Sequence, residues 1–296
     1  MRLLFTFALF LIGNLLQAQV EIVAEQDQDR NLTLLAFNKS KIPYTIQIEF
    51  IKLENLASPD GRLIYGVATP GKSNLVKLYS EYVNVQTGFQ YNTKLYKGDY
   101  LQSSQDRPAY LIPVEEGTTL SMRPLTVEIP QNTSVQGSLP YTGVGFYFEK
   151  PTVICAPRKG IVSEIKMDIE KASSGPSDFN SENYLEIYHQ DGTFSRLSGL
   201  KAGSAKVDIG DVVFPGQAIA ESSTLPDQTK HHVKMIQSRW EMGDRGMVWM
   251  NFPITIFADL QKVQSDQALE VLRVAHPTEL ISKEMDKKEL KKYLGK

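Results

Sequence analysis

Cysteine is almost absent from this chain of 296 residues, and histidine is scarce. The single cysteine, Cys155, excludes an internal disulfide, and its place in the apolar run TVICA predicts a buried core thiol. Only four histidines occur, of which His231 and His232 are adjacent. An excess of positive charge is also lacking, because the formal net charge is -2. We therefore predict no nucleic-acid partner.

Long apolar runs are missing after the N-terminus. The segment MRLLFTFALFLIGNLLQAQ has one early Arg2, an apolar stretch over 3–16 and a small residue at Ala18, which predicts a signal peptide over 1–19. A membrane anchor is disfavoured, because Asn14 interrupts a run already short of the roughly 20 apolar residues of a span. We predict a secreted, periplasmic or cell-envelope protein with no membrane span after cleavage.

Patterns typical of long amphipathic helices are absent from 20–115. In YTIQIEFIKL, Ile46, Ile48 and Phe50 alternate with polar residues, as in a half-buried strand. Further short strands separated by the turn signals SPDG and TPGK predict an immunoglobulin-like β-sandwich over this range. The polar, proline-containing range 116–140 is expected to be a linker.

The rest of the chain is predicted as a second β domain over 141–258 and a helical tail over 259–296. Three strand–turn–strand stretches occur in order: TGVGFYFEKPTVICAPRKGIVSEI, NYLEIYHQDGTFSRLSGL and VDIGDVVFPGQAIAESS. In the third, Gly210 and Gly216 suit tight turns. The tail is rich in helix formers and mixes Lys with Glu and Asp, which indicates a solvated helix. The expected fold class is mainly β.

Together the three stretches resemble the LytM/lysostaphin-type zinc endopeptidases, metallopeptidase family twenty-three, whose members cleave peptidoglycan cross-bridges. Members read H-x-G-x-D, I-x-H-x-D-G, V-x-x-G-D-x-V-x-x-G-Q-x-I and H-L-H-F in this order. Matching positions here are Gly143, Thr152, Ala156, Gly160, Val162, Ile187, His189, Asp191, Gly192, Leu200, Gly210, Asp211, Val213, Gly216, Gln217 and Ile219. The resemblance implies a LytM-type antiparallel domain, the duplicated hybrid motif, over 141–258.

The resemblance also implies where the zinc ligands should be. The three ligand positions of the family fall on Tyr141, Gly145 and Lys234. Glycine and a cationic lysine cannot coordinate zinc, and tyrosine is an uncommon ligand. The histidine of the family's Y-x-H-L motif corresponds to Gly199, so His232 alone retains a catalytic-site residue. We therefore expect a catalytically inactive relative that holds neither zinc nor another cofactor.

Strand geometry leads to the same expectation without the family. Successive side chains of a strand point to opposite faces, so His231 and His232 should diverge. The residues two positions further on are Val233 and Lys234, so neither histidine has a second histidine on its face. This pair is not expected to form a metal site.

The remaining groove is expected to bind a peptidoglycan peptide or a cell-wall hydrolase. Its lining is predicted to include Tyr141, His232 and Lys234, with Arg196 and Gly199 close by. Lys234 would either offer its ammonium to a ligand carboxylate or form a structural ion pair at the vacated metal position. These two roles stay open at this stage.

Two other functions stay open as well. An active endopeptidase would need replacement ligands, for which the candidates are Asp168, Glu170, Asp178 and His189. His189 is instead expected to pack beside the Asp191–Gly192 turn. A structural or adhesive envelope protein would bind through its sandwich domain.

Overall fold

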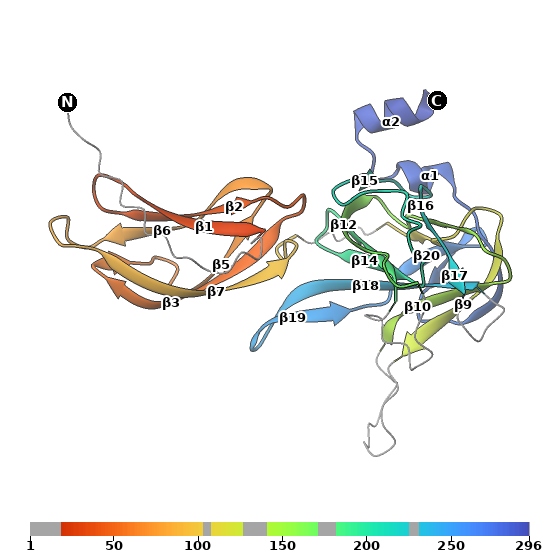
Figure 1. Ribbon diagram of the computed structural model, residues 1–296, viewed down its shortest axis with the longest axis horizontal. Coiled ribbons are helices and arrows are strands. Elements are labelled where there is room, and N and C mark those ends of the chain that lie inside the picture. Colours follow the sequence, from red (N-terminus) through yellow and green to blue (C-terminus); the bar gives the residue numbers. More distant parts are fainter. Residues whose placement is uncertain (1–18, 103–107, 127–140, 171–181, 225–230, 296) are drawn as a thin grey trace, which may run out of the picture. The chain divides into compact units, whose positions relative to one another are not determined.

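The computed structural model describes residues 19–102, 108–126, 141–170, 182–224 and 231–295, which form two compact units (Figure 1). Unit 1 contains the described residues up to 40 and those from 48 to 92, and unit 2 contains 41–47 and the described residues from 93 onward. The predicted signal peptide lies outside the described residues, apart from Gln19. Within the described ranges, no helix is long and apolar enough to cross a membrane.

Unit 1 consists of two layers of sheet (Figure 1). The first has the order β1 (Val20–Gln26), β2 (Leu32–Asn38), β6 (Gly71–Ser80) and β4 (Leu56–Ala57), and the second has β5 (Leu63–Ala68), β3 (Tyr44–Glu54) and β7 (Gly88–Lys97). The alternation predicted for β3 is confirmed, because Ile48 and Phe50 are buried whereas Glu49 and Ile51 are exposed. Burial of one side-chain row per sheet produces the sandwich.

Unit 2 is organised around a ten-stranded sheet. Its main path runs through β15 (Val212–Val213), β12 (Gly160–Lys166), β13 (Tyr184–Tyr188), β14 (Phe194–Ser198), β18 (His231–Gly243), β10 (Tyr141–Phe148), β9 (Thr119–Thr126) and β22 (Leu269–Arg273). Strands β17 (Ser223–Thr224) and β19 (Gly246–Asn251) also pair with β18. Smaller sheets join β11 (Val153–Cys155) to β16 (Ala218–Glu221), and β21 (Gln261–Gln264) to β20 (Thr255–Ala258) and β8 (Tyr110–Leu111).

One face of the large sheet supplies the core of unit 2. Phe146, Ile187, Leu197 and Met235 are all 1% exposed or less and belong to one apolar cluster. Cys155 is buried as predicted, and burial raises the pKa of its thiol to about 12. A thiol that stays protonated is a poor nucleophile.

Two segments differ from their predicted structure. Strand β9 lies in the range 116–140 expected to be a linker, because Leu120 and Met122 alternate into the core; residues 127–140 lie outside the described part. In the tail, β21 and β22 precede the helices, with Val263 and Leu272 buried. Alternate burial here outweighs a helix-forming composition.

Helices are confined to α1 (Thr278–Ser282) and α2 (Lys287–Leu294) among the described residues. The pairs of the large sheet are antiparallel. The prediction of a mainly β chain with a short helical end is therefore confirmed.

Substitution of Ile187 by alanine is expected to lower the free energy of unfolding by about 2–5 kcal/mol, because it opens a cavity in the core. Ile209 is 60% exposed, so Ile209→Ala removes the same atoms from the surface and should change stability by less than about 0.5 kcal/mol. Urea unfolding measures both, and equal effects would contradict the assigned core.

Candidate functional site

Strand β18 carries both adjacent histidines through the middle of the large sheet. Val233 and Met235 point into the apolar core, where both are fully buried. By alternation, His232 and Lys234 point to the opposite face of the sheet. His232 and Lys234 therefore make this face polar, whereas Val233 and Met235 make the core face apolar.

The two histidines contact different aromatic rings. His231 stacks on Phe148 and His232 stacks on Tyr147, each with ring centroids 6.3 Å apart. The same residues are cross-strand partners in the β10–β18 register. The predicted divergence of the two histidines is confirmed.

Lys234 lies between Gly145 on β10 and Ser198 on β14, its cross-strand partners on either side. Its Nζ donates to Oε1 of Glu182 at 2.5 Å, and both side chains are only 7% exposed. Of the two roles left open for Lys234, the structural ion pair is the one present. The glycine opposite the lysine leaves room for the ring of Tyr147, whose hydroxyl would lie 2.8 Å from a Cβ at Gly145.

Several polar atoms around this ion pair have no hydrogen-bond partner among the described residues. They are Oε2 of Glu182, Oγ of Ser198 and both ring nitrogens of His232. A buried polar atom without a partner is costly, so such atoms mark a place for a ligand group or water.

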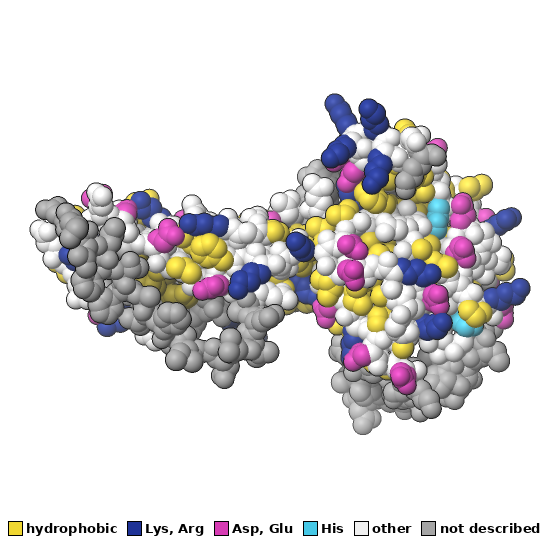
Figure 2. Space-filling model, turned by 45° about the horizontal axis from the view of Figure 1, so that its top comes forward, with side chains coloured by type: hydrophobic (Ala, Val, Ile, Leu, Met, Phe, Trp, Pro, Cys, Tyr) yellow, Lys and Arg dark blue, Asp and Glu magenta, His cyan; other side chains and the backbone are white. Residues whose placement is uncertain are grey.

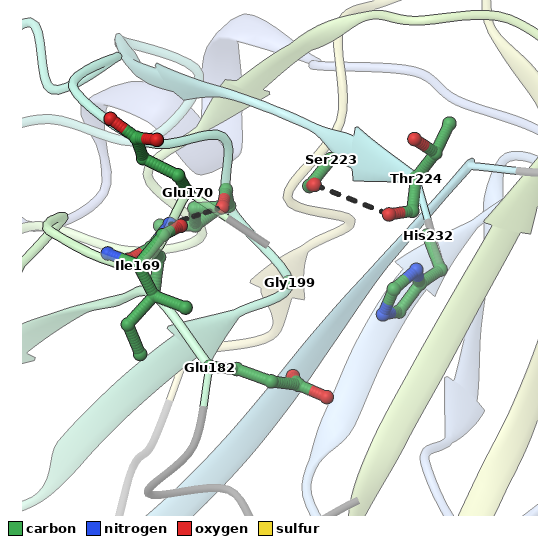
Figure 3. A pocket seen from close by; sticks show the side chains of 9 residues that line it. Ile169, Glu170, Glu182, Gly199, Ser223, Thr224 and His232 are labelled. Carbon is green, nitrogen blue, oxygen red and sulfur yellow. Dashed lines mark hydrogen bonds between the residues drawn. The ribbon is translucent and has the colours of Figure 1, made fainter. Parts of the chain in front are cut away.

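A small pocket of about 20 Å³ opens beside His232, and its walls include Glu170, Glu182, Gly199 and Ser223 (Figure 3). The imidazole of His232 and the carboxylate of Glu182 point toward the same space in Figure 3. Its volume accommodates about one water molecule or one small polar group. The pocket therefore has room for the polar end of a side chain and not for a whole ligand.

His232 is held neutral in this pocket. Burial and then the nearby Lys234 charge lower its pKa to about 4, against the opposing effect of Glu182. A neutral imidazole has one N–H donor and one acceptor nitrogen. Gly199, with φ +81°, lies so close that a Cβ there would be 2.8 Å from Nε2 of His232. Glycine is therefore required beside this histidine.

The hydroxyl of Tyr141 forms its hydrogen bond away from the pocket beside His232. This hydroxyl shares a 2.7 Å hydrogen bond with Oγ of Ser265, and burial raises its pKa to about 12. The β9–β10 register shifts between Tyr141 and Gly143, so the alternation that orients Gly145 does not extend to this tyrosine.

Arg196 is engaged on the neighbouring strands. Its guanidinium lies over the ring of Tyr184, 4.2 Å from the centroid, and Nη2 donates to Glu186 at 3.2 Å. The pocket lining thus includes His232 and Gly199 of the predicted set. Lys234 reaches it through Glu182, and the contacts of Tyr141 and Arg196 are with residues outside the lining.

The candidates for an atypical metal site are separated by their contacts. His189 is buried, with Nδ1 bonded to the carbonyl of Lys159 and Nε2 to Oγ of Ser195, and burial lowers its pKa to about 3. Asp168 is exposed, and Asp178 lies outside the described residues. Across the described ranges, no three His, Cys, Asp or Glu side chains are grouped as a metal would need.

Glu182 is the residue of the site that sequence reasoning missed. It lies 52 positions from Lys234 and belongs to no motif of the family resembled. An isolated carboxylate before a strand carries no sequence signal, so only the folded sheet reveals the pairing.

Three solved structures are similar to parts of the chain. A chain of the SpoIIQ–SpoIIIAH pore-forming complex is 17% identical, with a TM-score of 0.33 over 49% of this chain and 89% of that one. Pseudoalterin, an M23 metalloprotease from the deep sea, is 10% identical, with a TM-score of 0.31 over 55% and 98%. An M23 peptidase from Pseudomonas aeruginosa is 12% identical, with a TM-score of 0.26 over 65% and 82%.

No protein-family model matches the chain. No curated protein matches it either. At these identities and TM-scores, the three structures establish neither a family nor a function for this chain.

Glu182→Gln is expected to lower the free energy of unfolding by about 3–5 kcal/mol, because it leaves the buried Lys234 ammonium without its counter-charge. The matched control is Glu270→Gln, whose pair with Arg123 has side chains 73% and 58% exposed. That control should cost less than about 1 kcal/mol. Similar losses in the two variants would contradict a buried pair.

Acidification is expected to destabilise the protein through His232. Its folded pKa of about 4 lies below the ordinary 6.5, so the unfolded chain binds more protons between these pH values. This stabilisation is complete above pH 6.5 and is lost toward pH 4, with a slope of up to about 1.4 kcal/mol per pH unit for one group. His232→Gln should reduce the slope measured by urea unfolding by this amount, and His189, whose pKa of about 3 acts in the same direction, should account for part of what remains. An unchanged slope would exclude His232 as a source.

Proposed function

We propose that unit 2 is a degenerate LytM-type domain that binds a cell-wall peptide and does not hydrolyse it. The order of its sequence motifs supports the relationship, and the residues at the three zinc-ligand positions support the loss of catalysis. The observation that carries the proposal is the Lys234–Glu182 ion pair, which lies in register with Gly145.

The residues present do not fit zinc. Gly145 has no donor atom, and the ammonium of Lys234 is already bound to Glu182. The hydroxyl of Tyr141 is bonded to Ser265 and keeps its proton, since its pKa is about 12. Zinc hydrolysis requires three protein donors and an open position. We propose that the domain works without zinc or another cofactor.

The pocket beside His232 is suited to hydrogen bonding with a peptide. Glu170 on its rim and Oε2 of Glu182 are acceptors, and the neutral imidazole of His232 has one donor and one acceptor. The ligand group favoured here is an amide or ammonium N–H rather than a carboxylate, because two carboxylates line the wall and Lys234 is already neutralised.

The predicted signal peptide supports a secreted, periplasmic or cell-envelope location. The partner favoured by the family resemblance is a peptidoglycan peptide or a hydrolase that acts on the wall. In either case the polar face of β18 would present the binding groove.

Catalytic inactivity is tested with the full chain. After incubation with excess zinc and desalting, we expect zinc well below one equivalent by elemental analysis, and no soluble peptides from isolated peptidoglycan. An active lysostaphin-type enzyme on the same preparation is the positive control. Stoichiometric zinc together with peptide release would overturn the proposal in favour of an active endopeptidase with atypical ligands.

Ligand binding is tested by reversing charge at the pocket rim. Glu170→Lys is expected to weaken co-sedimentation with peptidoglycan by about fivefold or more, because it replaces an acceptor with a cation. Asp244→Lys makes the same charge change at an exposed position between β18 and β19 and should bind as the unmodified chain does. Equal binding by both variants would favour the adhesive alternative, in which the sandwich binds.

A further inference from the structure

The acidic residues near the C-terminus hold helix α2 on the sheet domain. Glu284 accepts two hydrogen bonds from Arg158, at 2.9 Å from Nε and 2.7 Å from Nη2, and Glu289 accepts one from Lys159 at 2.6 Å. Asp286 caps the helix by accepting from the backbone N–H groups of its first turn. The carboxylates of Glu284, Asp286 and Glu289 therefore already have hydrogen-bond partners.

The lysines of α2 lack such partners. Lys287, Lys288, Lys291 and Lys292 are exposed, and in the described part of the chain none of them forms an ion pair with a carboxylate. Figure 2 shows dark blue side chains gathered over this helix. The C-terminal run mixes Lys with Glu and Asp in the sequence. In the folded protein the carboxylates of α2 have partners, so the unpaired charge on this helix is positive.

A groove of about 800 Å³ lies beside these lysines. It is formed by α1, α2 and the turn between β15 and β16, and its apolar walls include Phe214, Ile281, Met285 and Tyr293. Lys292 belongs to the same wall. Apolar walls and adjacent unpaired positive charges are the two features expected of a site that binds an acidic amphipathic ligand.

Two carboxylates lie on the groove wall. Glu289 is neutralised by Lys159, whereas Glu116 keeps its charge while it accepts from the backbone N–H of His276, so one carboxylate faces the four lysines of α2. The field around the groove is therefore set by the lysines.

We propose that this groove binds an acidic amphipathic segment of a partner protein. Apolar side chains of the segment enter between Phe214 and Met285, while its carboxylates meet Lys288, Lys291 and Lys292. A bilayer with anionic lipids also attracts lysines, but a flat surface cannot fill a concave groove of this volume. This surface has no lining residue in common with the pocket beside His232.

The test uses the full chain and a fluorescein-labelled synthetic peptide of repeated Leu-Glu-Glu-Leu-Phe-Glu units. Fluorescence anisotropy should show binding that Lys288→Gln/Lys291→Gln/Lys292→Gln weakens about tenfold or more. Met285→Glu should weaken it similarly by placing a carboxylate in the groove. Lys94→Gln/Lys150→Gln/Lys262→Gln removes the same charge from other exposed positions and should leave binding unchanged. A peptide with Gln in place of every Glu should bind at least about tenfold more weakly than the acidic peptide.

Three results would overturn the proposal. The first is no binding of the acidic peptide up to about 1 mM, the weakest affinity of interest here. The second is an equal affinity for the peptide in the triple α2 lysine variant and in the triple control variant. The third is sedimentation with phosphatidylglycerol vesicles that depends on the α2 lysines but not on Met285, which would assign the surface to a membrane.

Discussion

The alternation of side chains along β18 is the constraint on which unit 2 depends. This strand of 13 residues pairs with β10 on one side and β14 on the other, so the direction of every side chain in its middle is determined by two neighbours. A slip of one residue would exchange Val233 and Met235 with His232 and Lys234 across the sheet. One face of β18 must stay apolar to form the core. Polar groups can be buried on the other face, because they point away from that core.

The polar face of β18 holds a buried ion pair beside the apolar core. The buried Lys234 ammonium requires a counter-charge, and Glu182 supplies it from a position just before β13. Gly145 lies directly across from Lys234, and the ring of Tyr147 fills the space beside this glycine. The ion pair thus joins the middle of β18 to a residue outside that strand.

The features that could be predicted from the sequence are those determined by the local alternation of side chains. The strand character of β3, the burial of Cys155 and the divergence of His231 and His232 all follow from side-chain direction over a few residues. The role of Glu182 could not be predicted, because its partner Lys234 is 52 positions away and Glu182 itself belongs to no motif.

Tyr141 differs from the motif expectation for a similar reason. Its partner Ser265 is 124 positions away, and a register shift in the β9–β10 pairing lies next to Tyr141, neither of which the motif position reveals. Strands β21 and β22 were missed because their composition favours helix, while their structure is imposed by strand pairing: β21 pairs with the preceding β20, and β22 pairs with β9, far earlier in the chain.

The position of Arg158 has a consequence for the C-terminal segment. This guanidinium is 3% exposed and contacts Asp191 and Glu284, and the second of these lies 126 residues downstream. Asp191 neutralises this guanidinium from within the sheet domain, whereas the two hydrogen bonds to Glu284 form only when the C-terminal segment packs on that domain. The segment around Glu284 is therefore anchored to the domain by a buried charge.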